Sequence, residues 1–171
     1  MALTLQQINA MSQAEFVAAL GGLFEHSPWV AEGAYGARPF EDGADLHAKM
    51  AAVMNNAPFP RALALLRAHP ELAGRAMVSK SLTADSANEQ TRSGLTQCTA
   101  EEFAHLQEMN AAYNKKFGWP FILAVKHLDR PAIIKTFAQR LENDAAGEFA
   151  ACLANIETIT RWRLDDLLKT Q

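Results

Sequence analysis

The sequence predicts an all-α fold, a single-domain helical bundle of about eight helices over residues 1–171, with one short extended segment near residues 119–125. Apolar residues recur at intervals of three and four along most of the chain, as on the buried face of a helix. No stretch shows the apolar and polar alternation of a half-buried strand. A chain of this length can bury a core without disulfides or metal.

The charge balance and the cysteine content exclude several classes of protein. Sixteen basic and nineteen acidic residues give a net charge of -3, without the Lys/Arg block typical of a nucleic-acid binder. Cys98 and Cys152 have no metal-site spacing, so we expect free thiols and a reducing compartment. The N-terminus does not resemble a signal peptide, and no run reaches the roughly 20 apolar residues of a membrane span. We expect a cytoplasmic protein that binds neither nucleic acid nor membrane.

The N-terminal region begins with a helix signal. Ser12 and Glu15 match a capping box, and apolar residues at helical spacing continue to about Glu25. Ser27-Pro28 ends that pattern. Residues 29–35 then predict a short helix or turn, and residues 36–43 predict a loop, because glycine and proline interrupt them.

Two helices are predicted next. Asp45 is the expected N-cap of the first, whose apolar side includes Met50 and Met54, and we expect both methionines in the core. Pro58-Phe59-Pro60 separates this helix from the second, which ends near His69.

The turn His69-Pro70 follows, because proline disfavours the helical conformation of the residue before it. Gly74 comes shortly after, as expected of a turn. Two interpretations fit: a solvated histidine at a helix end, or a catalytic side chain on a stiff turn. The turn alone does not separate them.

Two further helix starts follow. Ser86 and Glu89 repeat the capping-box spacing, and Gly94 lies where a C-terminal cap is expected. The same helix N-terminus would offer free N–H groups and a partial positive charge to an anion, and both interpretations can hold together. Thr99 starts a long helix that Gly118 ends.

The run Trp119–Val125 is apolar, has a proline at its second position and is too short for a typical helix, so we expect buried extended chain. Without a neighbouring strand, its peptide groups need other partners. They are either paired by irregular structure or presented to a ligand. A simple crossover through the core fits the pattern as well.

The last two predicted helices are separated by Asn143-Asp144, and the first of them starts at Asp129-Arg130-Pro131. Arg163 lies on the apolar stripe of the last helix, whereas Arg161 lies off it and is expected to be solvated. A guanidinium on a buried face is costly unless it is paired. Arg163 therefore either bonds a carboxylate of the protein or faces a cleft that receives an anion.

These motifs occur together in one known family. In their order and spacing along nearly the whole chain, they resemble the OHCU decarboxylase family, which acts on 2-oxo-4-hydroxy-4-carboxy-5-ureidoimidazoline (OHCU), an intermediate after urate oxidation. The motifs are His69-Pro70-Glu71-Leu72-Ala73-Gly74, Ser86-x-x-Glu89-Gln90, Gly94-Leu95, Phe117-Gly118-Trp119-Pro120-Phe121-Ile122, Ala124-Val125-Lys126, Arg140-Leu141-x-Asn143 and Arg163-Leu164. Two positions depart from the family pattern: Trp119 replaces a common phenylalanine, and His127 replaces a frequent glycine.

The resemblance implies an all-helical homodimer without cofactor or metal, which converts this small anionic substrate to (S)-allantoin and carbon dioxide. It implies that His69 is the catalytic acid/base and that Glu89 is the carboxylate beside it. The implied substrate contacts are Pro70, Ser86, Gln90, Arg163 and the backbone of Phe121, Ile122, Leu123, Ala124 and Val125.

Two other functions fit the sequence. The chain is alternatively a catalytically inactive helical interaction module of the same fold, in which His69-Pro70 is only a turn and Arg163 only part of a core ion pair. The third possibility is an enzyme of the preceding hydrolysis step, or one acting on a related ureido compound.

Overall fold

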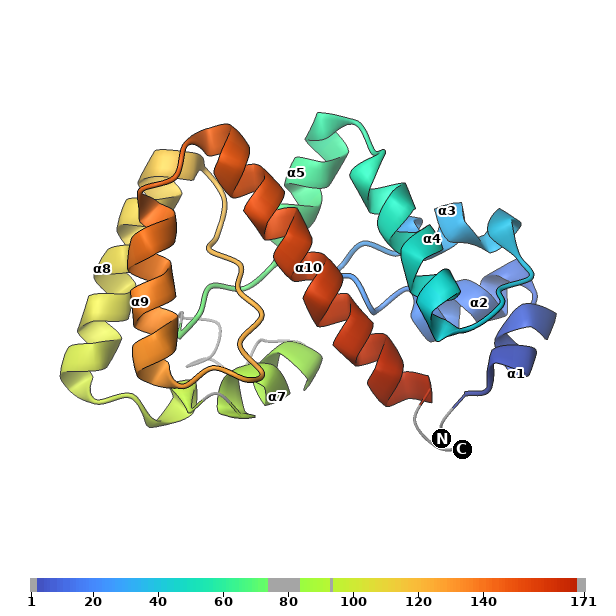
Figure 1. Ribbon diagram of the computed structural model, residues 1–171, viewed down its shortest axis with the longest axis horizontal. Helices are drawn as coiled ribbons and strands as arrows, with labels where there is room; N and C mark the ends of the chain where they lie inside the picture. Colours follow the sequence, from blue (N-terminus) through green and yellow to red (C-terminus); the bar gives the residue numbers. More distant parts are fainter. Residues whose placement is uncertain (1–2, 74–83, 93, 169–171) are drawn as a thin grey trace. The chain divides into compact units, whose positions relative to one another are not determined.

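The structure, a computed structural model, describes residues 3–73, 84–92 and 94–168 (Figure 1). These residues contain nine α-helices and no strand, which confirms the predicted all-α class. The chain divides into two compact units. Unit 1 is Met1–Ala68 with Glu157–Gln171, and unit 2 is His69–Ile156.

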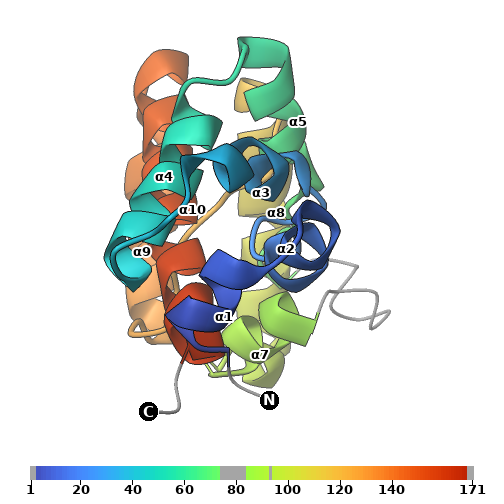
Figure 2. The ribbon, with the colours of Figure 1, turned by 90° about the vertical axis from the view of Figure 1, so that its right-hand side faces the viewer.

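Unit 1 contains five helices and the end of the long α10 (Ala145–Leu168). The five are α1 (Leu5–Ala10), α2 (Gln13–Leu20), α3 (Trp29–Ala34), α4 (Gly43–Asn55) and α5 (Phe59–Ala68). Figure 2 shows α2 beside α3 and α3 beside α4. Gly33 permits the approach of α3 to α4, because a Cβ at this position would lie 2.7 Å from Cγ1 of Val53.

The N-terminal helices differ from the prediction at two points. The helix predicted to reach Glu25 ends at Leu20, because glycines at 21 and 22 are poor helix formers, although the apolar pattern continues beyond them. The short helix α1 was not predicted. Its start is fixed by a capping box in which Thr4 and Gln7 bond each other's backbone N–H groups.

The N-cap of α4 is Asp42 rather than Asp45. The side chain of Asp42 accepts a hydrogen bond from Asp45 N at 2.8 Å. The Asp45 carboxylate instead accepts from Glu41 N and bonds Lys49 Nζ one turn further on. Met50 and Met54 on this helix are fully buried, as predicted.

Unit 2 contains α7 (Ala84–Arg92), α8 (Ala100–Phe117), α9 (Arg130–Leu141) and the first part of α10. Figure 1 shows α8 and α9 side by side. Thr99 and Asp129 cap α8 and α9 as predicted, and Gly118 ends α8 in a left-handed conformation with a φ of 81°.

Aromatic rings form the centre of unit 2. Phe121 and Phe137 stack with their ring centroids 3.8 Å apart, and the ring of Tyr113 meets both edge-on. All three side chains are at most 1% exposed. Phe121 thereby anchors the run Trp119–Val125 in the core. The run is largely buried, as predicted, and has no regular secondary structure.

Two sequence predictions concern the chain as a whole. Cys98 and Cys152 are both free thiols, as expected. Among the described residues, no helix is long and apolar enough to cross a membrane.

Candidate functional site

The helix α5 ends at Ala68, directly before His69-Pro70, as predicted from the proline. His69 is 8% exposed and its Nε2 atom is buried, so the interpretation as a solvated histidine at a helix end is wrong. Gly74, the expected end of the turn, lies outside the described residues.

Three amide side chains of α8 hold the residues that follow this turn. They recur at intervals of three and four and therefore share one face of the helix. We call Gln107, Asn110 and Asn114 the α8 amides. Their Nε2 or Nδ2 groups donate to Ala73 O at 2.6 Å, Leu72 O at 2.9 Å and Glu71 Oε1 at 2.6 Å, respectively.

Gln90 of α7 bonds the same short stretch. Its Oε1 accepts from Ala73 N at 3.0 Å, and its Nε2 donates to Glu71 O at 3.4 Å. Ala73 has a φ of 50°, a left-handed conformation that costs an alanine about 1–2 kcal/mol. Hydrogen bonds to both its N–H and its C=O offset that cost.

The predicted site residues of α7 share one face of this helix. Ser86 and Gln90 are buried and Glu89 is half-buried, and their spacing of three and four residues places them together. Ser86 lies inside the helix, which includes Ala84, so its prediction as the N-cap is wrong. Gly94 is left-handed with a φ of 78°, and its N–H donates to Thr91 O.

Side chains rather than a strand pair the backbone of Phe121–Val125. Arg140 Nη1 donates to Ile122 O, and Ala124 N donates to Asn155 Oδ1 at 3.0 Å. Within the described part of the chain, the N–H and C=O of Leu123 have no hydrogen-bond partner, although this residue is only 9% exposed. Buried peptide groups are almost always paired, so these two are candidates to bind a ligand.

The turn after this run does not need the glycine that is frequent in the family. Leu128 N donates to Val125 O at 3.0 Å and closes the turn. His127 is not among the described residues with a positive φ, so a side chain is tolerated there.

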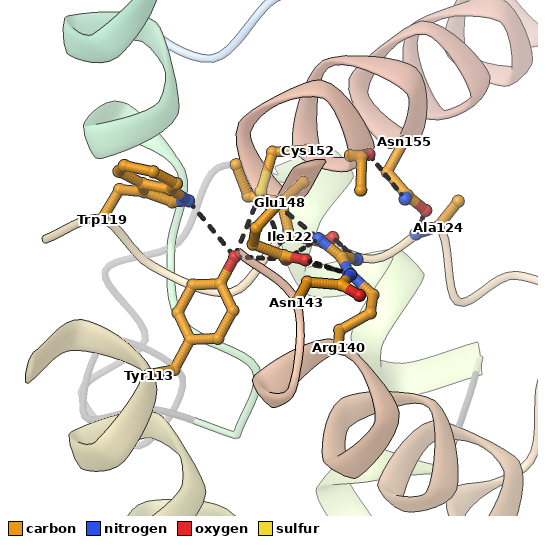
Figure 3. Close-up of polar contacts among 10 residues, drawn as sticks. Tyr113, Trp119, Ile122, Ala124, Arg140, Asn143, Glu148, Cys152 and Asn155 are labelled. Atoms are coloured by element: carbon orange, nitrogen blue, oxygen red, sulfur yellow. Dashed lines mark hydrogen bonds and ion pairs between the residues drawn. The ribbon is translucent and has the colours of Figure 1, made fainter. Parts of the chain in front are cut away.

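A buried polar network lies behind the run (Figure 3). Arg140 forms an ion pair with the fully buried Glu148, and Tyr113 donates its hydroxyl proton to the same carboxylate. Trp119 Nε1 donates to the Tyr113 hydroxyl at 3.2 Å. Cys152 Sγ lies 3.3 Å from the same hydroxyl. Burial raises the pKa of Tyr113, and the neighbouring Cys152 and Glu148 raise that pKa further. Tyr113 therefore stays protonated and acts as a donor.

Arg163 belongs to unit 1 and is buried, as predicted from its place on the apolar stripe. Its Nη1 donates to Leu23 O and its Nη2 to Glu25 Oε1, both at 3.1 Å. Arg163 is thus paired with a carboxylate of the protein, which is one of the two alternatives that the sequence left open. Arg161 is partly exposed and pairs with Asp165 one turn away.

The structure brings some of the predicted site residues together within unit 2. Gln90 bonds the stretch directly after His69-Pro70, and Ser86 and Glu89 share its helix face. Sequence reasoning did not single out the α8 amides or Asn155, and it named Arg140 only within a family motif, without a role. The interval of three and four between the amides was a usable signal, since amides on one helix face usually find a common partner surface.

No group of three or more metal-ligating side chains lies close enough to hold an ion in the described ranges.

Comparisons with known proteins place the chain in a family. A sequence model described as OHCU decarboxylase matches residues 9–165. The 2-oxo-4-hydroxy-4-carboxy-5-ureidoimidazoline decarboxylase of Amia calva is 33% identical over 165 residues, covering 96% of this chain and 94% of the relative.

Two solved structures are similar to the chain. The crystal structure of (S)-allantoin synthase has a TM-score of 0.79 and 27% identity, and the match covers 98% of this chain but 55% of that one. The crystal structure of OHCU decarboxylase in the presence of (S)-allantoin has a TM-score of 0.68 and 17% identity, covers 94% of this chain and all of that one, and shows the same fold. Since the family model and the Amia calva relative both match nearly the whole chain, the protein belongs to the OHCU decarboxylase family.

Proposed function

We propose that the protein decarboxylates OHCU to (S)-allantoin and carbon dioxide in urate catabolism, without a cofactor. The match of the family model to residues 9–165 carries this proposal. The candidate ligand-binding peptide groups of Leu123 support it, because a ureidoimidazoline has N–H and C=O groups that complement a peptide edge.

The chemistry needs no external electron sink. Loss of carbon dioxide leaves an electron pair on ring C4, and the adjacent C5=N bond accepts it as C4=C5 forms. The nitrogen of the former C5=N bond takes up a proton, which gives a neutral ene-ol. This ene-ol takes a second proton on one face of C5, while the C4 hydroxyl gives up its own proton and becomes a carbonyl. The enzyme therefore has to orient the carboxylate and deliver one proton stereospecifically.

His69 is the proposed acid/base, because imidazole exchanges protons near neutral pH and this ring is held on a buried turn. Glu89 is the proposed carboxylate beside it. Three roles suit Glu89: it holds the imidazole in one tautomer, it bonds the C4 hydroxyl of the substrate, or it repels the departing carboxylate electrostatically.

The proposed substrate contacts are those that the family resemblance implies. Pro70, Ser86 and Gln90 belong to unit 2, as does the backbone of Phe121, Ile122, Leu123, Ala124 and Val125. Arg163 is proposed to contribute as well. The family resemblance supports this contact, and the guanidinium also donates to Leu23 O and to Glu25 Oε1.

The decisive experiment generates OHCU freshly and follows allantoin by circular dichroism. Spontaneous decay yields a racemate, so we expect the protein to add a growing signal of the (S)-isomer. A racemic product formed at the rate of the blank would overturn the proposal and favour an inactive interaction module. Supplying 5-hydroxyisourate with and without its hydrolase detects activity on the preceding step.

The same assay tests His69. The variant His69→Asn keeps a planar polar side chain of similar size, so we expect the fold to persist and kcat to fall about 10²- to 10⁴-fold. Turnover at the wild-type rate would rule out His69 as the acid/base.

The proposal includes a homodimer in the cytoplasm. The family resemblance supports the first part, and the two free thiols support a reducing compartment. Light scattering after size-exclusion chromatography measures the oligomeric state, and a monomeric mass would contradict the dimer.

A further inference from the structure

Two peptide groups of the run Phe121–Val125 are tied to neighbouring helices. The carbonyl of Ile122 accepts from Arg140 of α9, and the N–H of Ala124 donates to Asn155 of α10 (Figure 3). The run has no strand beside it within the described part of unit 2, so these two side chains take the place of a neighbouring strand.

The two anchoring side chains are themselves fixed. Arg140 bonds Glu148 through Nε at 2.9 Å and through Nη2, and its guanidinium lies 4.5 Å from the centroid of the Phe121 ring. Asn155 Nδ2 donates to Ala151 O one turn earlier at 2.9 Å. Bonds at both ends of each anchor leave it little rotational freedom.

The anchored groups lie two residues apart. The peptides on either side of Leu123 are trans, and in a trans peptide the C=O of one residue and the N–H of the next point in opposite directions. Anchoring Ile122 and Ala124 on the side of α9 and α10 therefore turns the N–H and C=O of Leu123 to the opposite side. These are the two buried groups without a partner among the described residues.

We infer that Arg140 and Asn155 are positioning residues that present the peptide edge of Leu123 to the substrate. The inference rests on the proposed function, because it assumes that the run contacts the ligand. Neither side chain need touch the substrate. Their effect is to fix the direction in which one peptide edge faces, at a point where no strand does so.

Asn155 gives the cleaner test, because removing Arg140 would leave Glu148 buried without its ion-pair partner. Asn155→Leu removes the acceptor of the Ala124 N–H while keeping a similar volume. Asn155→Asp keeps that acceptor, but it loses the bond to Ala151 O and introduces a negative charge. The matched control is Asn55→Leu, which removes a hydrogen bond to Glu157 on the same helix α10.

Initial rates on fresh OHCU separate KM from kcat. A looser peptide edge weakens substrate binding, so we expect Asn155→Leu to raise KM about 5- to 10-fold with kcat within about 2-fold of wild type. For Asn155→Asp and Asn55→Leu we expect KM within about 2-fold of wild type. Hydrogen exchange of the Ala124 amide, followed by NMR, should accelerate in Asn155→Leu alone.

The outcomes separate the inference from the function beneath it. An inactive wild-type protein overturns both. An active wild type with the same KM in Asn155→Leu and Asn55→Leu overturns the positioning role while the proposed function stands. If Asn155→Leu does not fold, Asn155→Asp decides the question. A KM raised in Asn155→Asp as far as expected for the leucine variant would overturn the inference, because the acceptor of the Ala124 N–H is still present in this variant.

Discussion

Two arginines of α10, two residues apart, lie in opposite surroundings. The side chain of Arg163 is 5% exposed and pairs with Glu25, whose side chain is 1% exposed. The side chains of Arg161 and its partner Asp165 are 37% and 39% exposed. Water screens the second pair but not the first, so the loss of either arginine should have very different consequences.

We expect Arg163→Ala to lower the free energy of unfolding by about 3–5 kcal/mol, because it removes the arginine that pairs with the buried Glu25 carboxylate. The matched variant Arg161→Ala should cost at most about 1 kcal/mol. Urea unfolding followed by circular dichroism measures both. Equal losses in the two variants would contradict the assignment of Glu25 as the structural partner of Arg163.

The consequence for the site is practical. Lost activity in Arg163→Ala reports on substrate binding only under conditions in which the variant is still folded. Kinetic measurements on this variant therefore need a parallel measurement of its folded fraction.

At the scale of elements, α8 supports the turn that carries His69. Asn110 is 2% exposed, and its Nδ2 donates to Leu72 O three residues beyond the histidine. Its Oδ1 is also buried and has no hydrogen-bond partner within the described part of the chain. One hydrogen bond therefore holds this buried side chain.

We expect Asn110→Leu to lower the free energy of unfolding by about 1–3 kcal/mol, because it leaves Leu72 O buried and unpaired. Glu108→Leu, at an exposed position of the same helix, should change it by about 0.5 kcal/mol or less. Chemical denaturation measures both variants. A neutral Asn110→Leu would mean that the turn does not depend on this bond.

The sequence predicted many features of the elements that depend on close neighbours, although it misplaced the N-caps of α4 and α7. The caps Thr99, Asp129 and Gly118 and the helix end before Pro70 are set by residues within one turn, and all were found. The end of α2 was missed because Leu23 and Phe24 continue the apolar pattern into a buried turn beyond the helix.

The partners of the site could not be predicted in this way. The acceptor of Asn110 lies 38 residues earlier in the chain, and the carboxylate paired with Arg163 lies 138 residues earlier. Periodicity shows that such a side chain is buried, but it does not show which group the fold brings to it. The run Trp119–Val125 was predicted from the pattern of its own residues. Its anchors Arg140 and Asn155 lie on other elements and were not predicted.

At the scale of the whole molecule, unit 1 joins two stretches that are distant in sequence. Besides the Arg163 pair, His47 Nε2 lies 3.0 Å from Thr160 Oγ1, and Asn55 Nδ2 donates to Glu157 Oε1. The Thr160 hydroxyl donates to Glu157 O, so it accepts from an Nε2–H of His47. The neutral tautomer with its proton on Nε2 fits this arrangement.

The stability of unit 1 should depend on pH through His47. Burial lowers the pKa of His47 below its usual 6.5, and the Arg161 charge lowers it further, although Glu157 and Asp165 act in the opposite direction. The unfolded chain then binds a proton more readily than the folded one. The contribution of His47 to the free energy of unfolding is therefore complete above pH 6.5. It decreases as the pH drops towards the pKa of His47 in the folded protein.

His47→Gln keeps a hydrogen-bonding group but cannot be protonated, so it should lose less stability than wild type between pH 7.5 and pH 5.5. Melting temperatures at the two pH values, about one unit either side of the usual histidine pKa, measure the difference. His105→Gln, at an exposed position of α8, is the control. An identical pH dependence in wild type and His47→Gln would contradict the lowered pKa.

The division of unit 1 between two stretches also bears on how the chain is made. Translation runs from the N-terminus, so the ribosome completes His69–Ile156, all of unit 2, before it adds Glu157. Meanwhile Met1–Ala68 is already synthesised and lacks the last helical turns that complete its unit. The Leu23 carbonyl and the Glu25 carboxylate thus stay without Arg163 until the end of synthesis, and chaperones have their longest opportunity to bind at this end of the chain.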